Sequence, residues 1–227
     1  MWVGLASIPE RERSLERSVA SLLPHVDRVC VHLNRYRRMP SFLRTAKVRV
    51  TWSRQDGDLG DAGKFMQVAH APGYFLACDD DLAYPPDYAA STVAAIERHA
   101  RRAVVGYYGR LLSSRGLQIE RYHFVGDQAE ERRVHVLGSG VCGLYAPELL
   151  LSVDDFPEPN MADIWLGLWA QRRRVPLVVL PHPGDWLRQT THERSICSES
   201  LARTGSSMDT SSRQQSLCAS IVWELPP

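Results

Sequence analysis

The sequence predicts a single α/β domain built on a mostly parallel central sheet. Three observations lead to this prediction: short apolar runs alternate with amphipathic stretches over the first hundred residues, no internal repeat is visible, and no linker divides the 227-residue chain. Strands that alternate with helices form right-handed βαβ crossovers, which place the strands parallel to one another. In such a sheet, ligands bind beyond the carboxyl ends of the strands, so polar residues that follow strands are the first candidates for a site.

The first half of the chain carries the clearest alternation. In the stretch 14–23, apolar residues recur at helical spacing and Pro24 ends the segment, which predicts a helix. The apolar run Tyr74–Cys78 has the length of a buried strand. Read in this way, the sequence predicts strands at 2–7, 28–33, 48–52, 74–78 and 103–107, and helices at 14–23, 61–71 and 86–102.

The second half is less regular. The polar stretch 111–133 is expected to form hairpins or a substrate loop, and 134–145 is expected to form a strand, a glycine turn and a second strand. A helix is predicted at 162–172 and a last buried strand at 176–180. Residues 190–227 are rich in Ser, Thr, Arg and Gln, and we predict a polar C-terminal tail or a lid over the site.

Composition excludes several classes of protein. With 27 Lys and Arg against 26 Asp and Glu, the net charge of +1 argues against a nucleic-acid binder, which needs a positive excess. Hydrophobic residues make up 44% of the chain, which excludes global disorder. Five scattered cysteines favour reduced thiols over disulfides or a zinc site. Because no targeting segment or membrane-length apolar run is visible, we expect a cytoplasmic protein, either free or peripheral to the inner membrane.

Three consecutive carboxylates, Asp79, Asp80 and Asp81, directly follow the predicted strand 74–78. Carboxylates this close together repel one another unless a cation or hydrogen-bond donors compensate their charge. Their hard oxygen atoms suit Mg²⁺ or Mn²⁺, with phosphates completing the coordination sphere. The alternative is a solvated turn that caps the next helix, but the position after a buried strand favours a functional site.

The segment YFLACDDDLAYPPDY, residues 74–88, resembles the DxD signature of glycosyltransferases of the GT-A fold, especially those of family 2. The resemblance implies a GT-A domain over residues 1–189, with a nucleotide-binding half at 1–108 and an acceptor and catalytic half at 109–189. In that fold the first acidic residue contacts the ribose and the last holds the metal. By position, this assigns Asp79 or Asp80 to the ribose and Asp81, together with Asp79, to Mn²⁺ or Mg²⁺.

The same resemblance implies a nucleotide-sugar site made from the segments that follow the other strands. Many family members carry an acidic residue at the position of Asn34, so the base that this chain reads stays open. Glycines at 57–63 let backbone approach a nucleotide, although a plain loop with a helix cap is the alternative. Lys64 is one of only two lysines in a chain with 25 arginines, which makes it a more specific candidate for the nucleotide site than any single arginine. The residues expected to contact the nucleotide-sugar here are Pro9, Arg11, Asn34, Asp58, Asp61 and Lys64.

The acceptor half offers a candidate base. Family members place paired acids before an aromatic residue at the start of a helix, and this chain has Ala162, Asp163, Ile164 and Trp165 there. The resemblance therefore implies Asp163 as the catalytic base, and the alternative is an acid that stabilises the helix dipole. Asp154 and Asp155 are the fallback candidates, although the prolines that follow them suggest a loop away from the site. The turn of Gly138, Ser139 and Gly140 resembles the one that lies under the donor sugar. His182, or else His192, is expected as an additional metal ligand.

Taken together, the resemblance implies a metal-dependent, inverting transfer of a sugar from a nucleotide-diphospho-sugar to a hydroxyl of a glycan or lipid-linked glycan acceptor. A bacterial surface-polysaccharide pathway is the expected setting, with peripheral contact to membrane-bound assembly machinery as an open option. One alternative is a sugar-phosphate nucleotidyltransferase, although residues 8–13 lack the glycine-rich signature of that class. Another is a catalytically inactive sugar-binding module, because Ala162 replaces one of the paired acids.

Overall fold

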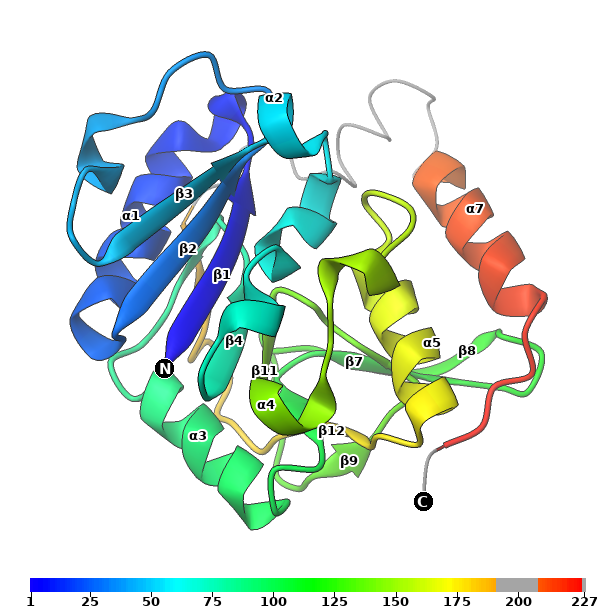
Figure 1. The fold of residues 1–227 in the computed structure, drawn as a ribbon. Helices are drawn as coiled ribbons and strands as arrows, with labels where there is room; N and C mark the ends of the chain where they lie inside the picture. The colour runs from blue at the N-terminus through cyan, green and yellow to red at the C-terminus, as the bar shows by residue number, and fades with distance from the viewer. Residues whose placement is uncertain (191–207, 226–227) are drawn as a thin grey trace.

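The protein is described by a computed structural model, which covers residues 1–190 and 208–225. At its centre lies a large mixed sheet with helices on both faces (Figure 1). The prediction of an α/β protein with a mostly parallel sheet is therefore confirmed. None of the helices in these ranges is long and apolar enough to span a membrane.

The large sheet has eight strands, which are β1 Trp2–Ser7, β2 Arg28–Leu33, β3 Val48–Trp52, β4 Tyr74–Cys78, β6 Val104–Gly106, β9 Arg132–Arg133, β11 Val141–Tyr145 and β12 Leu177–Val179. Their order is β3-β2-β1-β4-β11-β6-β12-β9. Pairing is parallel from β3 through β4 and between β6 and β12, whereas β11 and β9 are antiparallel to their neighbours. Because β1, β2 and β4 end at the same edge, the segments that follow them meet there.

The two faces of the sheet are covered by different elements (Figure 1). The helices are α1 Glu12–Leu22, α2 Ser53–Asp56, α3 Tyr88–Arg98, α4 Ala146–Leu149, α5 Ala162–Arg173 and α7 Met208–Ala219. Helices α1 and α3 pack on one face, and α5 packs on the other. Side chains alternate along β4, so Leu76 packs in the core on the side of α1 and α3, and Phe75 packs in the core on the side of α5. Burial of both faces explains why β4 reads as a continuous apolar run.

The helix predicted for residues 61–71 is wrong. The structure has two short 3₁₀ helices there, Gly60–Phe65 and Val68–His70, which lie on the same face as α5. The first is pressed onto the sheet: a Cβ added at Gly4 of β1 would lie 1.9 Å from the carbonyl oxygen of Lys64. The tight packing of this backbone against β1 overrides the helical spacing of the apolar residues.

The less regular second half folds around a smaller antiparallel sheet. Strands β10 Val136–Leu137, β7 Gly109–Leu112 and β8 Gln118–Tyr122 form it in that order, and β5 Leu82–Ala83 pairs separately with β13 Arg188–Gln189. The β7–β8 hairpin lies in the polar stretch expected to hold hairpins. The predicted strand, glycine turn and strand are also confirmed, as β10, the turn 138–140 and β11.

The described end of the chain packs against this smaller sheet (Figure 1). Cys218 and Trp223 are buried in a cluster with Leu112 of β7 and Ile164 of α5. The indole N–H of Trp223 donates to the carbonyl oxygen of Cys218 at 2.9 Å. Part of the segment predicted as a tail or a lid is therefore folded onto the domain.

Candidate functional site

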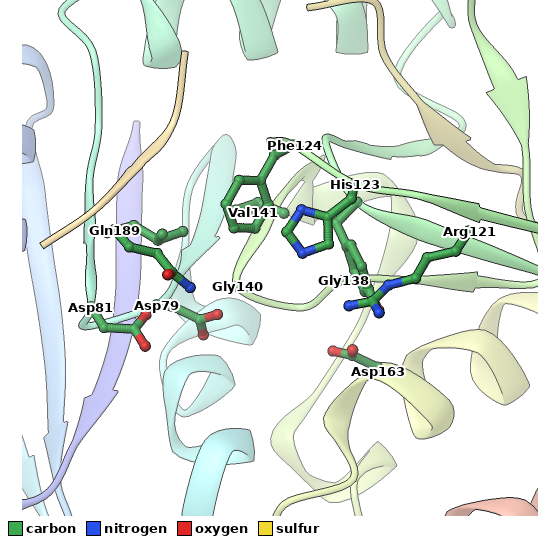
Figure 2. Close-up of a pocket in the computed structure, with 12 residues that line it drawn as sticks. Asp79, Asp81, Arg121, His123, Phe124, Gly138, Gly140, Val141, Asp163 and Gln189 are labelled. Atoms are coloured by element: carbon green, nitrogen blue, oxygen red, sulfur yellow. The ribbon is translucent and has the colours of Figure 1, made fainter. Parts of the chain in front are cut away.

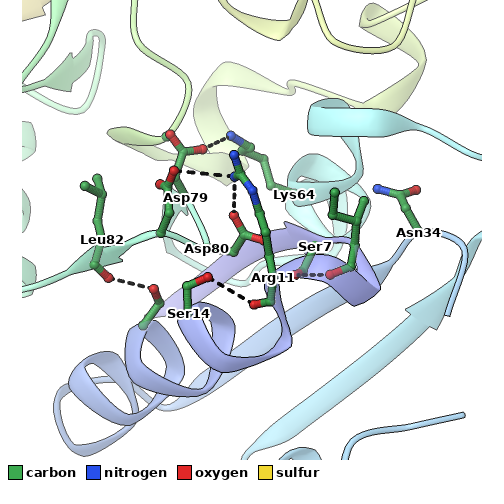
Figure 3. A network of polar contacts seen from close by, with 12 residues as sticks. Ser7, Arg11, Ser14, Asn34, Lys64, Asp79, Asp80 and Leu82 are labelled. Carbon is green, nitrogen blue, oxygen red and sulfur yellow. Dashed lines mark hydrogen bonds and ion pairs between the residues drawn. The ribbon is translucent and has the colours of Figure 1, made fainter. Parts of the chain in front are cut away.

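The carboxyl ends of β1, β2 and β4 gather most of the polar residues that the sequence singled out (Figure 3). The first two carboxylates after β4 have different partners. Asp79 forms an ion pair with Lys64, whereas Asp80 accepts a hydrogen bond from Arg11 at 2.8 Å. Each of these two carboxylates therefore has its own cation.

Arg11 reaches the carboxylates from the short 3₁₀ helix Pro9–Arg11, which follows β1. Its Nη1 atom lies 2.8 Å from Asp80 and 3.4 Å from Asp81. Burial disfavours the charge on Arg11, but the carboxylates of Asp80 and Asp81 outweigh burial and raise its pKa. Arg11 therefore stays charged, while Pro9, predicted with it, is exposed at the start of the turn.

Lys64 lies beneath Asp79, with 4% of its side chain exposed. Burial disfavours its charge, but Asp79 and Asp61 outweigh burial and raise its pKa. Asp61 itself accepts from the backbone N–H of Ala162 at 3.1 Å, and burial raises its pKa to about 6 although Lys64 acts against this. The buried amine of Lys64 therefore neutralises Asp79 from inside the protein and is not on the surface of the site.

Asn34 and Asp58 hold the loop that follows β3 rather than projecting from it. The amide of Asn34 donates to the carbonyl oxygen of Gly60 at 2.8 Å and accepts from the backbone N–H of Leu59 at 3.3 Å. Asp58 accepts from the backbone N–H of Gly60 at 3.1 Å, and Gly60 has a positive φ of 53° that favours glycine. These two residues, both expected to contact the nucleotide-sugar, therefore hydrogen-bond to the backbone of this loop.

The turn 138–140 packs directly under Asp79. A Cβ added at Gly140 would lie 1.8 Å from the carboxylate of Asp79, so any larger residue at this position would displace that side chain. The backbone N–H of Asp79 donates to the carbonyl oxygen of Gly140 at 2.9 Å, and the hydroxyl of buried Tyr84 donates to the same oxygen at 2.9 Å. Tyr84 also accepts from the N–H of Asp79 at 2.7 Å. Sequence reasoning missed Tyr84, although it belongs to the YPPDY stretch quoted above.

A pocket of about 190 Å³ opens above this turn, and carboxylates lie on two sides of it (Figure 2). Asp79 and Asp81 line one side, and Asp163 lines the opposite side from the first turn of α5. One oxygen of Asp163 accepts from the backbone N–H of Ser139 at 2.8 Å. The hydrogen bond fixes the orientation of the carboxylate, and the helix N-terminus favours its negative charge.

The donor set on the side of Asp81 fits a hard divalent cation. Burial and the charge of Asp79 together raise the pKa of Asp81 to about 6, because no cation fully offsets its charge. One oxygen of Asp80 is buried and has no hydrogen-bond partner among the residues that the structure describes. Within the described ranges, no group of three or more His, Cys, Asp or Glu side chains is arranged for a metal. Two carboxylates plus ligand phosphates is, however, a common arrangement for Mg²⁺.

His182 does not line the pocket with these carboxylates. Its Nδ1 atom lies 2.8 Å from the carbonyl oxygen of Leu180, and its ring stands edge-on to Tyr107, with ring centroids 5.6 Å apart. Its Nε2 atom is buried and meets no hydrogen-bond partner in the described part of the chain. His192, the alternative ligand, lies outside the described residues.

The far wall of the pocket contains residues that sequence reasoning missed. Arg121 of β8 and His123, just after that strand, both line the pocket (Figure 2). Both also contact the ring of Tyr108. The polar stretch 111–133 has no hydrophobic periodicity, and Arg121 is one of 25 arginines, so no local signal separated it from its neighbours.

The pocket therefore combines two chemical capacities. Asp79 and Asp81 can hold a cation together with an anionic ligand, and Asp163, across the pocket, can accept a proton. Comparison with protein-family models gives no match for this chain, and comparison with curated protein sequences gives none either. What the site does has to be judged from its own residues.

Proposed function

We propose that this protein is a metal-dependent, inverting glycosyltransferase of the GT-A type. It would move a sugar from a nucleotide-diphospho-sugar to a hydroxyl of a glycan acceptor. The observation that carries the proposal is the separation of Asp79 and Asp81 from Asp163 across one pocket. A displacement at a sugar carbon needs this arrangement, with the leaving group on one side and a base on the other.

On the donor side, Asp81 and Asp79 would hold Mn²⁺ or Mg²⁺. When bound, this ion supplies positive charge that stabilises the departing diphosphate. Arg11 fixes Asp80 and Asp81, and Lys64 fixes Asp79, so the carboxylates keep their positions whether or not a ligand is bound. The glycine turn 138–140 lets the sugar approach backbone closely.

On the acceptor side, Asp163 is proposed as the general base. It accepts the proton of the acceptor hydroxyl while that oxygen bonds to the anomeric carbon, and the bond from that carbon to the diphosphate breaks. The backbone N–H of Ser139 donates to Oδ1 of Asp163 and so holds this carboxylate in place. Attack from the face opposite the leaving group inverts the anomeric configuration.

The biological setting follows from the resemblance of residues 74–88 alone. It favours the synthesis of a bacterial surface polysaccharide in the cytoplasm, on a free or lipid-linked glycan. A lipid-linked acceptor would bring the protein into peripheral contact with the membrane or with the assembly machinery there.

The first test is a panel of UDP-, GDP-, CMP- and dTDP-sugars in thermal-shift measurements with and without Mn²⁺. A ligand that binds the folded state raises the melting temperature by mass action, so one metal-dependent shift is expected. No shift with any donor would contradict the proposal. Release of pyrophosphate from a nucleoside triphosphate and a sugar phosphate would instead show a nucleotidyltransferase.

The second test separates the role of Asp163 from a structural one. Asp163→Asn keeps an oxygen that can accept from Ser139 but removes the base, so kcat is expected to fall by about 10²–10⁴ with little change in the KM for the donor. Asp154→Asn, an exposed acid before the same helix, is the control. Equal turnover of Asp163→Asn and the wild type, or a product with retained anomeric configuration, would refute this role.

A further inference from the structure

The pocket wall beside Asp163 carries a positive charge. The guanidinium of Arg121 lies over the ring of Tyr108, with its central carbon 5.3 Å from the ring centroid. His123 stands edge-on to the same ring at 5.2 Å. Tyr108 is itself wedged against the glycine turn, since a Cβ at Gly138 would lie 2.5 Å from the tyrosine ring. Arg121 is therefore placed at the pocket by a rigid aromatic support.

The side chain of Arg121 is not held by an ion pair to any residue that the structure describes, Asp163 included. None of the ion pairs formed within residues 1–190 and 208–225 includes Arg121. Figure 2 shows its guanidinium turned toward the pocket on the side of Asp163, across from Asp79 and Asp81. Arginine presents a planar fork of N–H donors that matches a carboxylate or phosphate group.

We propose that Arg121 binds an acidic group of the acceptor, so that this pocket selects an acidic glycan. The acidic group is a carboxylate or phosphate next to the hydroxyl that reacts. Naming the ligand an acceptor, and preferring it to the donor diphosphate, both rest on the proposed function; the binding of an anionic group by Arg121 does not.

The charges around the pocket favour an acidic group of the acceptor over the donor diphosphate as the ligand of Arg121. The diphosphate belongs with the metal ion at Asp79 and Asp81, on the other side of the pocket. An acidic group beside Asp163 would be repelled by that carboxylate unless a cation stood next to both, and Arg121 is the cation that the pocket wall provides. Burial, followed by the charge of Arg121, lowers the pKa of His123, so this ring adds a neutral hydrogen-bonding group at pH 7.

The test uses two probes that differ in one group: methyl β-D-glucuronide, with a carboxylate, and methyl β-D-glucoside, with a hydroxymethyl group. Binding is followed by NMR titration of the full chain in Mg²⁺ at pH 7.5. The wild type is expected to bind the glucuronide at least about tenfold more tightly, because a charged hydrogen bond is lost with the glucoside. Arg121→Gln is expected to abolish this difference, and Arg121→Lys to keep part of it.

Arg115→Gln is the matched control, since Arg115 is exposed in the turn of the same hairpin. It should bind both probes as the wild type does. Equal affinity of the wild type for the two sugars, or equal behaviour of Arg121→Gln and Arg115→Gln, would overturn the proposal.

Nucleoside diphosphates distinguish the two sources of the anion. Calorimetric titration of UDP and GDP with Mg²⁺ is expected to give the same affinity for the wild type and Arg121→Gln. A loss of affinity confined to the nucleotide would assign Arg121 to the donor and overturn the proposal. If no nucleotide-sugar binds but the glucuronide preference depends on Arg121, the proposed function fails while acidic-sugar recognition stands.

Discussion

On the proposed function, Asp81 is the residue at which a proton and a metal ion compete. Burial and the charge of Asp79 raise its pKa to about 6, while a bound cation needs the deprotonated carboxylate. The affinity for Mn²⁺ is therefore expected to be constant above pH 7 and to fall by about tenfold per pH unit below 6. Calorimetric titration between pH 5 and 8 measures this profile.

A matched substitution shows whether Asp81 is the group that titrates. Asp81→Asn removes the ionisable carboxylate, so its Mn²⁺ affinity should be low and should vary less between pH 5 and 8. Asp155→Asn, a carboxylate outside the pocket, should keep the profile of the wild type. An affinity of the wild type that is flat through pH 6 would contradict the assignment of the metal to Asp81.

The sequence was most informative about residues that directly follow a strand. Arg11, Asn34 and Asp79 could be placed at one edge of the sheet because parallel strands end together. What each side chain contacts could not be predicted in this way. Lys64 is buried under Asp79 because the backbone at 60–65 is pressed onto β1, and no pattern in the sequence reports that contact.

At the scale of elements, the turn between β10 and β11 sets the position of Asp79. Gly140→Ala would place a methyl group 1.8 Å from the carboxylate, which must then turn away from Lys64 and from the pocket. We expect a loss of Mn²⁺ affinity of about tenfold or more, since a ligand moved by about 1 Å is poorly placed. The measurement is the same titration at pH 7.5.

Gly73→Ala is the control for this substitution. A Cβ there would meet its nearest neighbour, Tyr145, at 3.9 Å, which is an ordinary contact. This variant should bind Mn²⁺ as the wild type does. Unchanged binding by Gly140→Ala would show that Asp79 does not take part in holding the metal.

Elements with two buried faces, or with apolar residues at regular spacing, were predicted well. Elements whose shape depends on contacts with residues far away in the sequence were not. Strand β4 was visible as an apolar run, and α1 as a regular spacing. The stretch 61–71 has helical spacing too, but contact with β1 and β2 holds it in shorter turns. The wall of Tyr108 and Arg121 exists only because the hairpin β7–β8 folds over the turn 138–140, which is a long-range arrangement.

At the scale of the whole molecule, the end of the chain contributes to stability. Trp223 is 4% exposed and packs with Cys218 and Leu112 beside α5. Trp223→Ala is expected to lower the free energy of unfolding by about 3–5 kcal/mol, because it removes a large buried side chain. Urea denaturation followed by circular dichroism measures the change.

Val222→Ala, next to Trp223 and 67% exposed, is the control and is expected to change stability by less than about 0.5 kcal/mol. If Trp223→Ala were as stable as the wild type, the end of the chain would be dispensable for the fold.

The polar composition of residues 190–227 predicted a tail or a lid. The few apolar residues that anchor this segment to the domain stand among many Ser and Gln residues, so the composition gave no sign of them.

The separate partners of Asp79 and Asp80 have a thermodynamic consequence. Lys64 and Arg11 neutralise these two charges from within the chain, so neither carboxylate needs an external ion to be compatible with the folded state. These two carboxylates therefore do not tie folding to metal binding, unlike the ligands of small domains that fold only around their metal. On the proposed function, the free energy of binding is then available for selecting the ligand instead of ordering the chain.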